Sequence, residues 1–277
     1  MENNNEFIKK MIREFLLKEY ANLIEGIDID KQNKTVSFNN SHEKNINTST
    51  LINPTYYNVN GIDVISIFKR KKSEEFSYDG NPLIYALKGI NDWKFNNPQS
   101  DIINLLKQFI RIAEKIQPKY DTIITIPSTN ELNTQFLYRL NKIIKSDFQI
   151  NDYLYKLTAE EVYEDFVDWK QLGIDYGNKY DKMNGVLNSC FGKMRDEYGG
   201  YFSYKFIKNV NLRKYIKKTM YSDIEKTIEY APYINEKNIL ILDDTIGSGQ
   251  TISEGCEEIL EMFTPQSITV ITLFSKL

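Results

Sequence analysis

Histidine and cysteine are almost absent from this 277-residue chain. His42 is the only histidine, and Cys190 and Cys256 are the only cysteines. So few of these residues exclude a zinc site built from cysteine and histidine, a Ser-His-Asp triad and a disulfide framework. The sparing use of cysteine suits a reducing compartment, and we therefore expect a cytoplasmic protein.

Long apolar runs and an excess of one charge are missing as well. No stretch approaches the roughly 20 apolar residues that span a membrane, and the opening MENNNEFIKK is too polar for a signal peptide. The 35 basic and 38 acidic residues give a formal net charge of −3. This balance provides no whole-chain basic field for nucleic acid, although local basic patches leave such a partner open. We expect no contact with a membrane.

Residues 1–75 have the pattern of an α+β extension. Residues 6–24 carry apolar side chains at helical spacing, which predicts an amphipathic helix. The stretches IDIDKQNKTVSF and DVISIFKRKK read as strands that follow it. The extension is therefore a candidate surface for a protein partner or for self-association.

From residue 76 onward, helices and strands alternate. Residues 100–116 and 250–263 are amphipathic, whereas YDTIITIP, NILIL and SITVITLF are short, continuous apolar runs. Runs of this kind are typical of strands buried on both faces of a parallel sheet. We therefore predict an α/β fold over residues 76–277, with a mostly parallel central sheet flanked by helices. Ligands of such sheets bind beyond the carboxyl ends of the strands, where residues 127–133 and 243–251 fall.

Residues 243–251, DDTIGSGQT, have the composition of a ligand-binding turn. Gly247 and Gly249 allow the backbone to turn tightly, and the amides of residues 247–251 would point from a helix N-terminus, where anions bind favourably. Asp243 and Asp244 would repel a phosphate and suit sugar hydroxyls or a metal ion instead. A ligand with a phosphate at one end and vicinal hydroxyls in its middle matches both halves.

Other phosphate motifs match this turn less well. The Walker pattern requires a lysine that is absent here, and the dinucleotide fingerprint requires glycine at the position of Ile252. A capped strand-to-helix turn without any ligand is the alternative interpretation. The combination of acidic, hydroxyl and glycine residues within nine positions favours a ligand.

The stretch ILILDDTIGSGQT resembles the ribose 5-phosphate-binding signature of type I phosphoribosyltransferases. That signature is an apolar strand, two acidic residues, a short variable stretch, then Thr or Ser, Gly, any residue and Thr. Upstream, YDGNPLIYALKG and YDTIITIPSTNELN are similar in order and spacing to the competence-protein ComF group. The resemblance covers residues 76–277, except for residues 150–235, which hardly match.

The resemblance implies roles for the matching positions. Asp243 and Asp244 would be the catalytic pair, holding the ribose hydroxyls of phosphoribosyl pyrophosphate directly or through Mg²⁺. The loop that binds the 5-phosphate would consist of Thr245, Ile246, Gly247, Ser248, Gly249, Gln250 and Thr251. Pyrophosphate would lie at Ser128, Thr129 and Asn130. Its departure leaves positive charge on the ribose, which nearby carboxylates stabilise without a covalent nucleophile.

Positive charge for the pyrophosphate is not evident near its expected loop, because residues 127–133 contain no Arg or Lys. Lys88 is one candidate to fold over the site. The basic run Arg213, Lys214, Lys217 and Lys218 is another, although a solvated face is the simpler interpretation of that run. Residues 150–235 are rich in aromatics, which indicates core side chains more than a base-stacking platform. An insertion of this length between sheet strands is where a hood over the acceptor would be built.

Two classes of function follow from these observations. The first is an enzyme of nucleotide metabolism, a Mg²⁺-dependent glycosyltransferase that transfers the phosphoribosyl group or cleaves an N-glycosidic bond. The second is a non-catalytic module of a bacterial conflict or antiphage system. It would sense a nucleotide and act through a protein or nucleic-acid partner.

Overall fold

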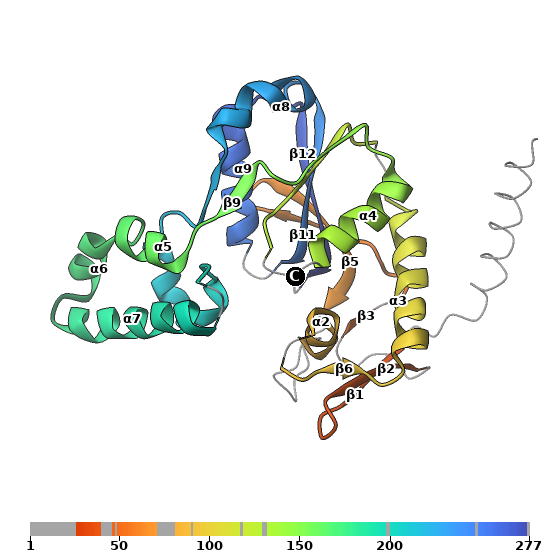
Figure 1. Ribbon diagram of the computed structural model, residues 1–277, viewed down its shortest axis with the longest axis horizontal. Helices are drawn as coiled ribbons and strands as arrows, with labels where there is room; N and C mark the ends of the chain where they lie inside the picture. The colour runs from red at the N-terminus through yellow and green to blue at the C-terminus, as the bar shows by residue number, and fades with distance from the viewer. Residues whose placement is uncertain are drawn as a thin grey trace, which may run out of the picture.

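The computed structural model describes residues 26–39, 46–47, 49–70, 81–89, 91–116, 119–128, 132–197, 200–246 and 249–275 (Figure 1). The helix predicted over residues 6–24 lies outside these ranges. So do four predicted ligand-binding residues: Thr129, Asn130, Gly247 and Ser248. Within the described ranges, no helix combines the length and apolar character needed to cross a membrane.

A mostly parallel sheet of seven strands forms the centre of the described structure. Its strands are β3 (Ile46–Asn47), β4 (Thr55–Val59), β5 (Ile62–Arg70), β7 (Thr122–Thr125), β8 (Phe148–Ile150), β11 (Asn238–Ile246) and β12 (Ser267–Ser275). The order is β3-β5-β12-β11-β7-β8, and β4 also pairs with β5. The strands from β5 to β8 are all parallel, whereas β3 and β4 run antiparallel to β5. The predicted α/β class with a mostly parallel sheet is confirmed.

Strand β5 corrects the predicted domain boundary at residue 75. We had placed this strand in an N-terminal extension, but it is the parallel neighbour of β12, with Ile65 opposite Ile271. All five residues from 64 to 68 are buried, and a strand buried on both faces requires neighbouring strands and covering helices. Strands β3, β4 and β5 therefore belong to the central sheet, and the boundary after residue 75 is wrong.

A small second sheet lies beside the central one. It contains β1 (Gly26–Asp30), β2 (Thr35–Asn39) and β6 (Lys94–Phe95), in that order. Its apolar side chains, including Val36 and Phe38, pack into the same core as helices α2 (Asn81–Lys88) and α3 (Pro98–Ala113). This sheet therefore extends the main core and does not form an independent body.

Helices cover both faces of the central sheet (Figure 1). α2, α3 and α4 (Leu132–Ile144) share one core with Leu240 and Leu242 of β11. α8 (Thr227–Ile234) and α9 (Gln250–Met262) share the other with Ile239 and Ile241. Successive side chains of a strand point to opposite faces, so an unbroken apolar run supplies both cores.

The predicted insertion is a separate, largely helical body. Its stem is an antiparallel pair, β9 (Leu154–Lys156) with β10 (Met220–Ser222). Between these strands lie α5 (Ala159–Asp165), α6 (Trp169–Tyr176), α7 (Tyr180–Glu197) and the short 3-10 helices η1 (Gly177–Lys179), η2 (Tyr204–Phe206) and η3 (Val210–Tyr215). A further 3-10 turn, η4 (Ile224–Lys226), precedes α8. The body projects to one side of the sheet in Figure 1.

The insertion has its own core, and aromatic side chains supply much of it. Phe191, Phe202 and Tyr215 are almost fully buried there. The predicted role of the aromatic residues as core is confirmed, but the bounds of 150–235 are too wide. Tyr153 and α8 pack against the central sheet instead.

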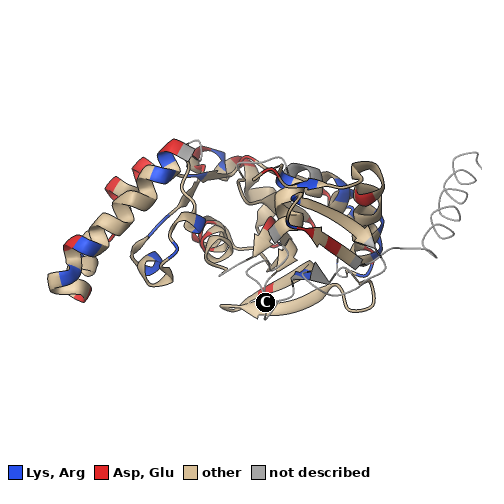
Figure 2. Cartoon of the chain, turned by 90° about the horizontal axis from the view of Figure 1, so that it is seen from below, with Lys and Arg blue, Asp and Glu red and all other residues tan. Residues whose placement is uncertain are grey.

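In Figure 2, Lys and Arg are interspersed with Asp and Glu along α7, the long helix at the left.

Candidate functional site

The candidate site lies where two neighbouring strands send their helices to opposite faces of the sheet. β7 leads into α4, which packs on one face, and its neighbour β11 leads into α9, which packs on the other. A crevice opens between such diverging connections, at the carboxyl ends of the strands. The backbone amide of Ile126 still donates to the carbonyl of Leu242, at 2.8 Å, so the two strands separate only beyond this point.

A cavity of about 620 Å³ occupies this crevice. It is lined by α2, by the ends of β7 and β11, by the first turn of α9, and by β9, β10, η2 and η3 of the insertion. Ligand pockets in proteins range from roughly 300 to 1,000 Å³, so the space is adequate for a nucleotide-sized molecule. The predicted site residues that line it are Ser128, Asp243, Asp244, Thr245, Ile246, Gly249, Gln250 and Thr251.

Asp243 and Asp244 are part of strand β11, which continues to Ile246. The sequence predicts a turn directly after Leu242. The strand instead continues for four residues beyond its apolar run. The aspartates are only 8% and 6% exposed. Because neighbouring side chains of a strand alternate, Asp244 faces α2, where its Oδ2 forms an ion pair with the Lys88 ammonium.

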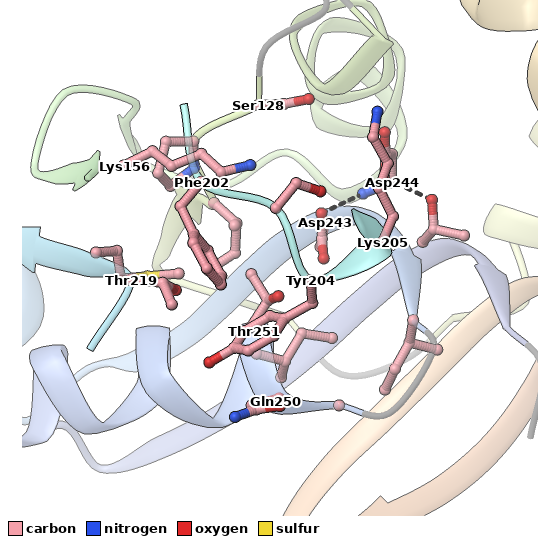
Figure 3. Close-up of a pocket in the computed structure, with 18 of the residues that line it drawn as sticks. Ser128, Lys156, Phe202, Tyr204, Lys205, Thr219, Asp243, Asp244, Gln250 and Thr251 are labelled. Atoms are coloured by element: carbon pink, nitrogen blue, oxygen red, sulfur yellow. Dashed lines mark hydrogen bonds between the residues drawn. The ribbon is translucent and has the colours of Figure 1, made fainter. Parts of the chain in front are cut away.

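Hydrogen bonds hold the two carboxylates in place. The backbone amide of Asp244 donates to Oδ1 of Asp243 at 2.8 Å, and the Thr245 hydroxyl donates to Oδ1 of Asp244 at 2.6 Å (Figure 3). Buried carboxylates require such donors and a positive partner to remain ionised.

Two lysines of the insertion bring further positive charge to the aspartates. Lys156 extends from β9 toward Asp243 and Asp244 (Figure 3). Burial lowers the pKa of Lys156, the two aspartates act in the opposite direction, and Lys88 lowers that pKa further. Partial burial, with Lys88 and Lys156 nearby, lowers the pKa of Lys205 to about 8. These three lysines and two aspartates therefore form one electrostatic cluster.

Sequence reasoning missed Lys156 and Lys205 and included residues that do not reach the site. Of the basic run, only Arg213 lines the cavity. Lys214 and Lys217 are largely exposed and pair with Asp175 and Asp168 of the insertion, while Lys218 pairs with Glu258 at 2.5 Å. The interpretation as a solvated face is confirmed for Lys214 and Lys217. Lys88, the other candidate, lines the cavity. The only sequence signal for the missed lysines is that each interrupts an apolar, aromatic stretch.

The first turn of α9 forms another wall of the cavity. Gly249 precedes the helix with a φ of 78°, in the left-handed region. A Cβ atom at this position would lie 2.7 Å from Cγ1 of Val59, so both the backbone and the available space require glycine. The amides of the first turn have no acceptors within the helix, and no side chain caps it. Gln250 and Thr251 line the cavity at this wall.

Helix α9 also holds the stem of the insertion in place. Glu254 accepts hydrogen bonds from the Thr219 hydroxyl at 2.6 Å and from the Met220 amide at 2.9 Å, as well as from the Thr219 amide. One turn later, Glu258 accepts from the Ser222 amide at 2.9 Å. Burial raises the pKa of Glu254, and these hydrogen bonds oppose that change. The insertion is thus anchored to the helix whose first turn lines the cavity.

Asp244 does not suit Mg²⁺ bound directly to its oxygens. In the described parts of the chain, no group of three or more His, Cys, Asp or Glu side chains is placed to hold a metal ion. Mg²⁺ is commonly held by one or two carboxylates plus oxygens of the substrate and water. Here one oxygen of Asp244 contacts Lys88 and the other accepts from Thr245. Nearby ammonium groups would also repel a divalent cation. These contacts do not suit direct coordination of Mg²⁺ by Asp244, whereas Mg²⁺ held indirectly, through the ligand, stays a prediction.

Comparison of the chain with models of known protein families and with curated proteins gives no match in either case. The chemistry of the cavity is therefore the basis on which a function is assigned.

Proposed function

We propose that the protein binds phosphoribosyl pyrophosphate, or a nucleotide that contains ribose 5-phosphate, and acts as a phosphoribosyltransferase-like enzyme. The observation that carries this proposal is the joint placement of the aspartate pair and the first turn of α9 on one cavity. One wall offers backbone amides to a phosphate, and the other offers carboxylates to vicinal hydroxyls. The resemblance of residues 239–251 to the phosphoribosyltransferase signature supports the same ligand.

The two walls assign the parts of the ligand. The 5-phosphate lies against the amides of Gln250 and Thr251, which begin helix α9, and the helix dipole favours an anion at this N-terminal end. The ribose hydroxyls donate to Asp243 and Asp244. In this arrangement C1, the ribose carbon at which substitution occurs, faces the part of the cavity that the insertion borders.

The reaction consists of one substitution at C1. The bond from C1 to the leaving phosphate oxygen breaks, positive charge develops on the ribose, and a nucleophilic atom of the acceptor forms the new bond. The carboxylates stabilise the developing positive charge, and basic side chains stabilise the negative charge on the leaving group. Phe202, Tyr204 and Tyr85 border the cavity and would provide an apolar surface for a planar acceptor.

Binding and turnover test this proposal separately. Calorimetry with ribose 5-phosphate and with phosphoribosyl pyrophosphate measures binding, and phosphorus NMR measures release of pyrophosphate in the presence of a panel of nucleobases. In Asp243→Asn, loss of a charged acceptor should weaken binding about tenfold or more. Glu257→Asn, an exposed change on α9, is the control. Absence of binding by both sugar phosphates would refute the proposal.

The Lys88–Asp244 ion pair favours a second candidate function, a nucleotide-sensing module. A ribose hydroxyl that bonds to Asp244 must compete with the Lys88 ammonium, so binding would alter the contact between α2 and β11. Such a change can be transmitted to a partner without any reaction. Tight binding with no release of pyrophosphate for any acceptor would favour the sensor over the enzyme.

A further inference from the structure

We infer that Lys156 and Lys205, together with Lys88, bind a second phosphate or diphosphate group of the ligand, so that a doubly phosphorylated ribose binds without a divalent metal ion. This inference rests on the proposed function, because it assumes that ribose 5-phosphate occupies the other half of the cavity. It adds the class of ligand and the source of the positive charge.

The first support is the convergence of basic residues from distant segments. Lys88 lies on α2, Lys156 on β9 and Lys205 on η2, and all three border one cavity with Arg213 of η3. The lysines act on one another, since Lys88 and Lys156 both lower the pKa of Lys205. Ammonium groups this close repel one another unless anions lie between them. The arrangement is therefore built around negative charge.

The two aspartates supply only part of that negative charge. The described residues that line the cavity include four basic side chains and two carboxylates. Asp244 is paired with Lys88. The remaining excess of positive charge occurs in a chain with a net charge of −3, so it is a local property of the cavity. A phosphate or diphosphate group carries the charge needed to balance it.

The second support is that the backbone around these lysines is held firmly. Lys156 pairs with Met220 across the β9–β10 stem, and the next residue, Leu157, donates its amide to the carbonyl of Thr219 at 2.9 Å. Lys205 lies three residues after Phe202. Phe202 is 1% exposed, and its amide donates to the carbonyl of Leu157 at 3.0 Å. Both lysines are thus presented from anchored segments, and the anchoring through Glu254 fixes them relative to α9.

The competing explanation is that the three lysines serve only to balance the negative charge of Asp243 and Asp244. If that were their only role, a ligand with one phosphate and a ligand with two would bind equally well. A ligand that replaces Lys88 at Asp244 would also release this ammonium toward the second phosphate. The two explanations therefore differ in how affinity depends on the number of phosphate groups.

The test is calorimetry with ribose 5-phosphate and with phosphoribosyl pyrophosphate, each in EDTA and in excess Mg²⁺. We expect phosphoribosyl pyrophosphate to bind about tenfold or more tightly than ribose 5-phosphate in EDTA, because charge-assisted hydrogen bonds to the second group are retained. Added Mg²⁺ should change this ratio by less than about threefold.

Variants assign the effect to particular lysines. The double variant Lys156→Gln with Lys205→Gln should reduce the affinity for phosphoribosyl pyrophosphate to that for ribose 5-phosphate, and leave the latter nearly unchanged. Lys208→Gln is the matched control, because Lys208 lies three residues from Lys205 but does not border the cavity. Circular dichroism shows whether each variant is folded. Lys205→Arg, which keeps the positive charge, should bind phosphoribosyl pyrophosphate nearly as the parent does, in contrast to Lys205→Gln.

The outcomes separate this inference from the proposed function. If phosphoribosyl pyrophosphate binds only with Mg²⁺, or if the double variant binds as the parent does, the inference is overturned while the proposed ligand stands. If ribose 5-phosphate and phosphoribosyl pyrophosphate fail to bind with and without Mg²⁺, the proposed function itself fails.

Discussion

The ammonium group of Lys88 and the carboxylate of Asp244 form an ion pair that joins α2 to the end of β11. Their side chains are only 17% and 9% exposed. Each charge therefore depends on the other, since a buried charge without a partner is costly. The pair couples a helix on one face of the sheet to the strand that carries the candidate site.

Removal of Lys88 should destabilise the protein. Lys88→Met leaves Asp244 buried without its positive partner and should lower the free energy of unfolding by about 3 kcal/mol. Urea denaturation followed by circular dichroism measures this change. The double variant Lys88→Met with Asp244→Leu removes both charges and should recover part of the loss. A single variant as stable as the parent would show that the pair contributes nothing.

Gly249→Ala should destabilise the protein. Gly249→Ala combines left-handed backbone strain with the contact to Val59, and the expected loss is about 3 kcal/mol. Gly61→Ala is the matched control, because its φ is 85° but no atom lies within 4 Å of the added Cβ. The control should lose only about 1 kcal/mol, from strain alone.

A second change tests the cause of that loss. Val59→Ala in the Gly249→Ala background removes the atom that the new Cβ would meet. Thermal unfolding should then show partial recovery, even though Val59→Ala alone is destabilising. Equal stability of Gly61→Ala and Gly249→Ala would mean that the close contact has no effect.

Binding of phosphoribosyl pyrophosphate should weaken as the pH rises through about 8. Lys205 has a pKa of about 8, lowered from the ordinary value by partial burial and by Lys88 and Lys156, while Asp243 and Asp244 lie across the cavity. Above this pH its amine loses the proton that attracts phosphate. The ligand phosphates are already ionised there, since their second pKa is about 6.

Calorimetry between pH 7 and 9.5 measures this dependence. Lys205→Arg keeps its positive charge throughout the range and should bind with little change in affinity. Because the ligand favours the ammonium form, the parent protein should also take up protons on binding above pH 8. This uptake appears as a binding enthalpy that depends on the buffer. A flat pH profile for the parent protein would contradict the assignment.

The anchor between α9 and the insertion should depend on an acceptor at position 254. Glu254→Ala removes the acceptor for the Thr219 and Met220 amides and for the Thr219 hydroxyl, and should lower the free energy of unfolding by about 2 kcal/mol. Glu254→Gln should be tolerated, because its carbonyl oxygen accepts from the amides and its amino group donates to the hydroxyl. Glu257→Ala, an exposed change on α9, is the control.

Lowering the pH toward 4.5 should stabilise the protein through protonation of Glu254. Burial raises its pKa in the folded protein above the ordinary value of 4.5, so the folded state binds a proton more readily than the unfolded state does. This group therefore contributes stability as the pH falls from the raised pKa toward 4.5, and that contribution is lost as the pH rises. Urea denaturation across this range should show the effect in the parent protein and not in Glu254→Gln.

Several elements were predictable because local patterns specify them. The apolar run of β7 and the amphipathic spacing of α3 and α9 are properties of consecutive residues, so they appear in the sequence directly. The apolar run NILIL predicts strand β11 only as far as Leu242, whereas the strand continues to Ile246. Its polar continuation through Asp243 and Asp244 is stabilised by pairing with β12 as far as Ser275.

The chemistry of residues 243–251 could be read from the order of the residues: two carboxylates are followed by a glycine-bearing helix start, with no histidine or cysteine to support another mechanism. The sequence also indicated the alternation of strands and helices. These properties depend on residue type and spacing along the chain. Only the tertiary structure placed β5 inside the sheet and brought Lys88, Lys156 and Lys205 to the aspartates. Those contacts join segments separated by long stretches of chain. Pairing with β12 places β5, and packing of the insertion against α9 brings Lys156 and Lys205 to the cavity.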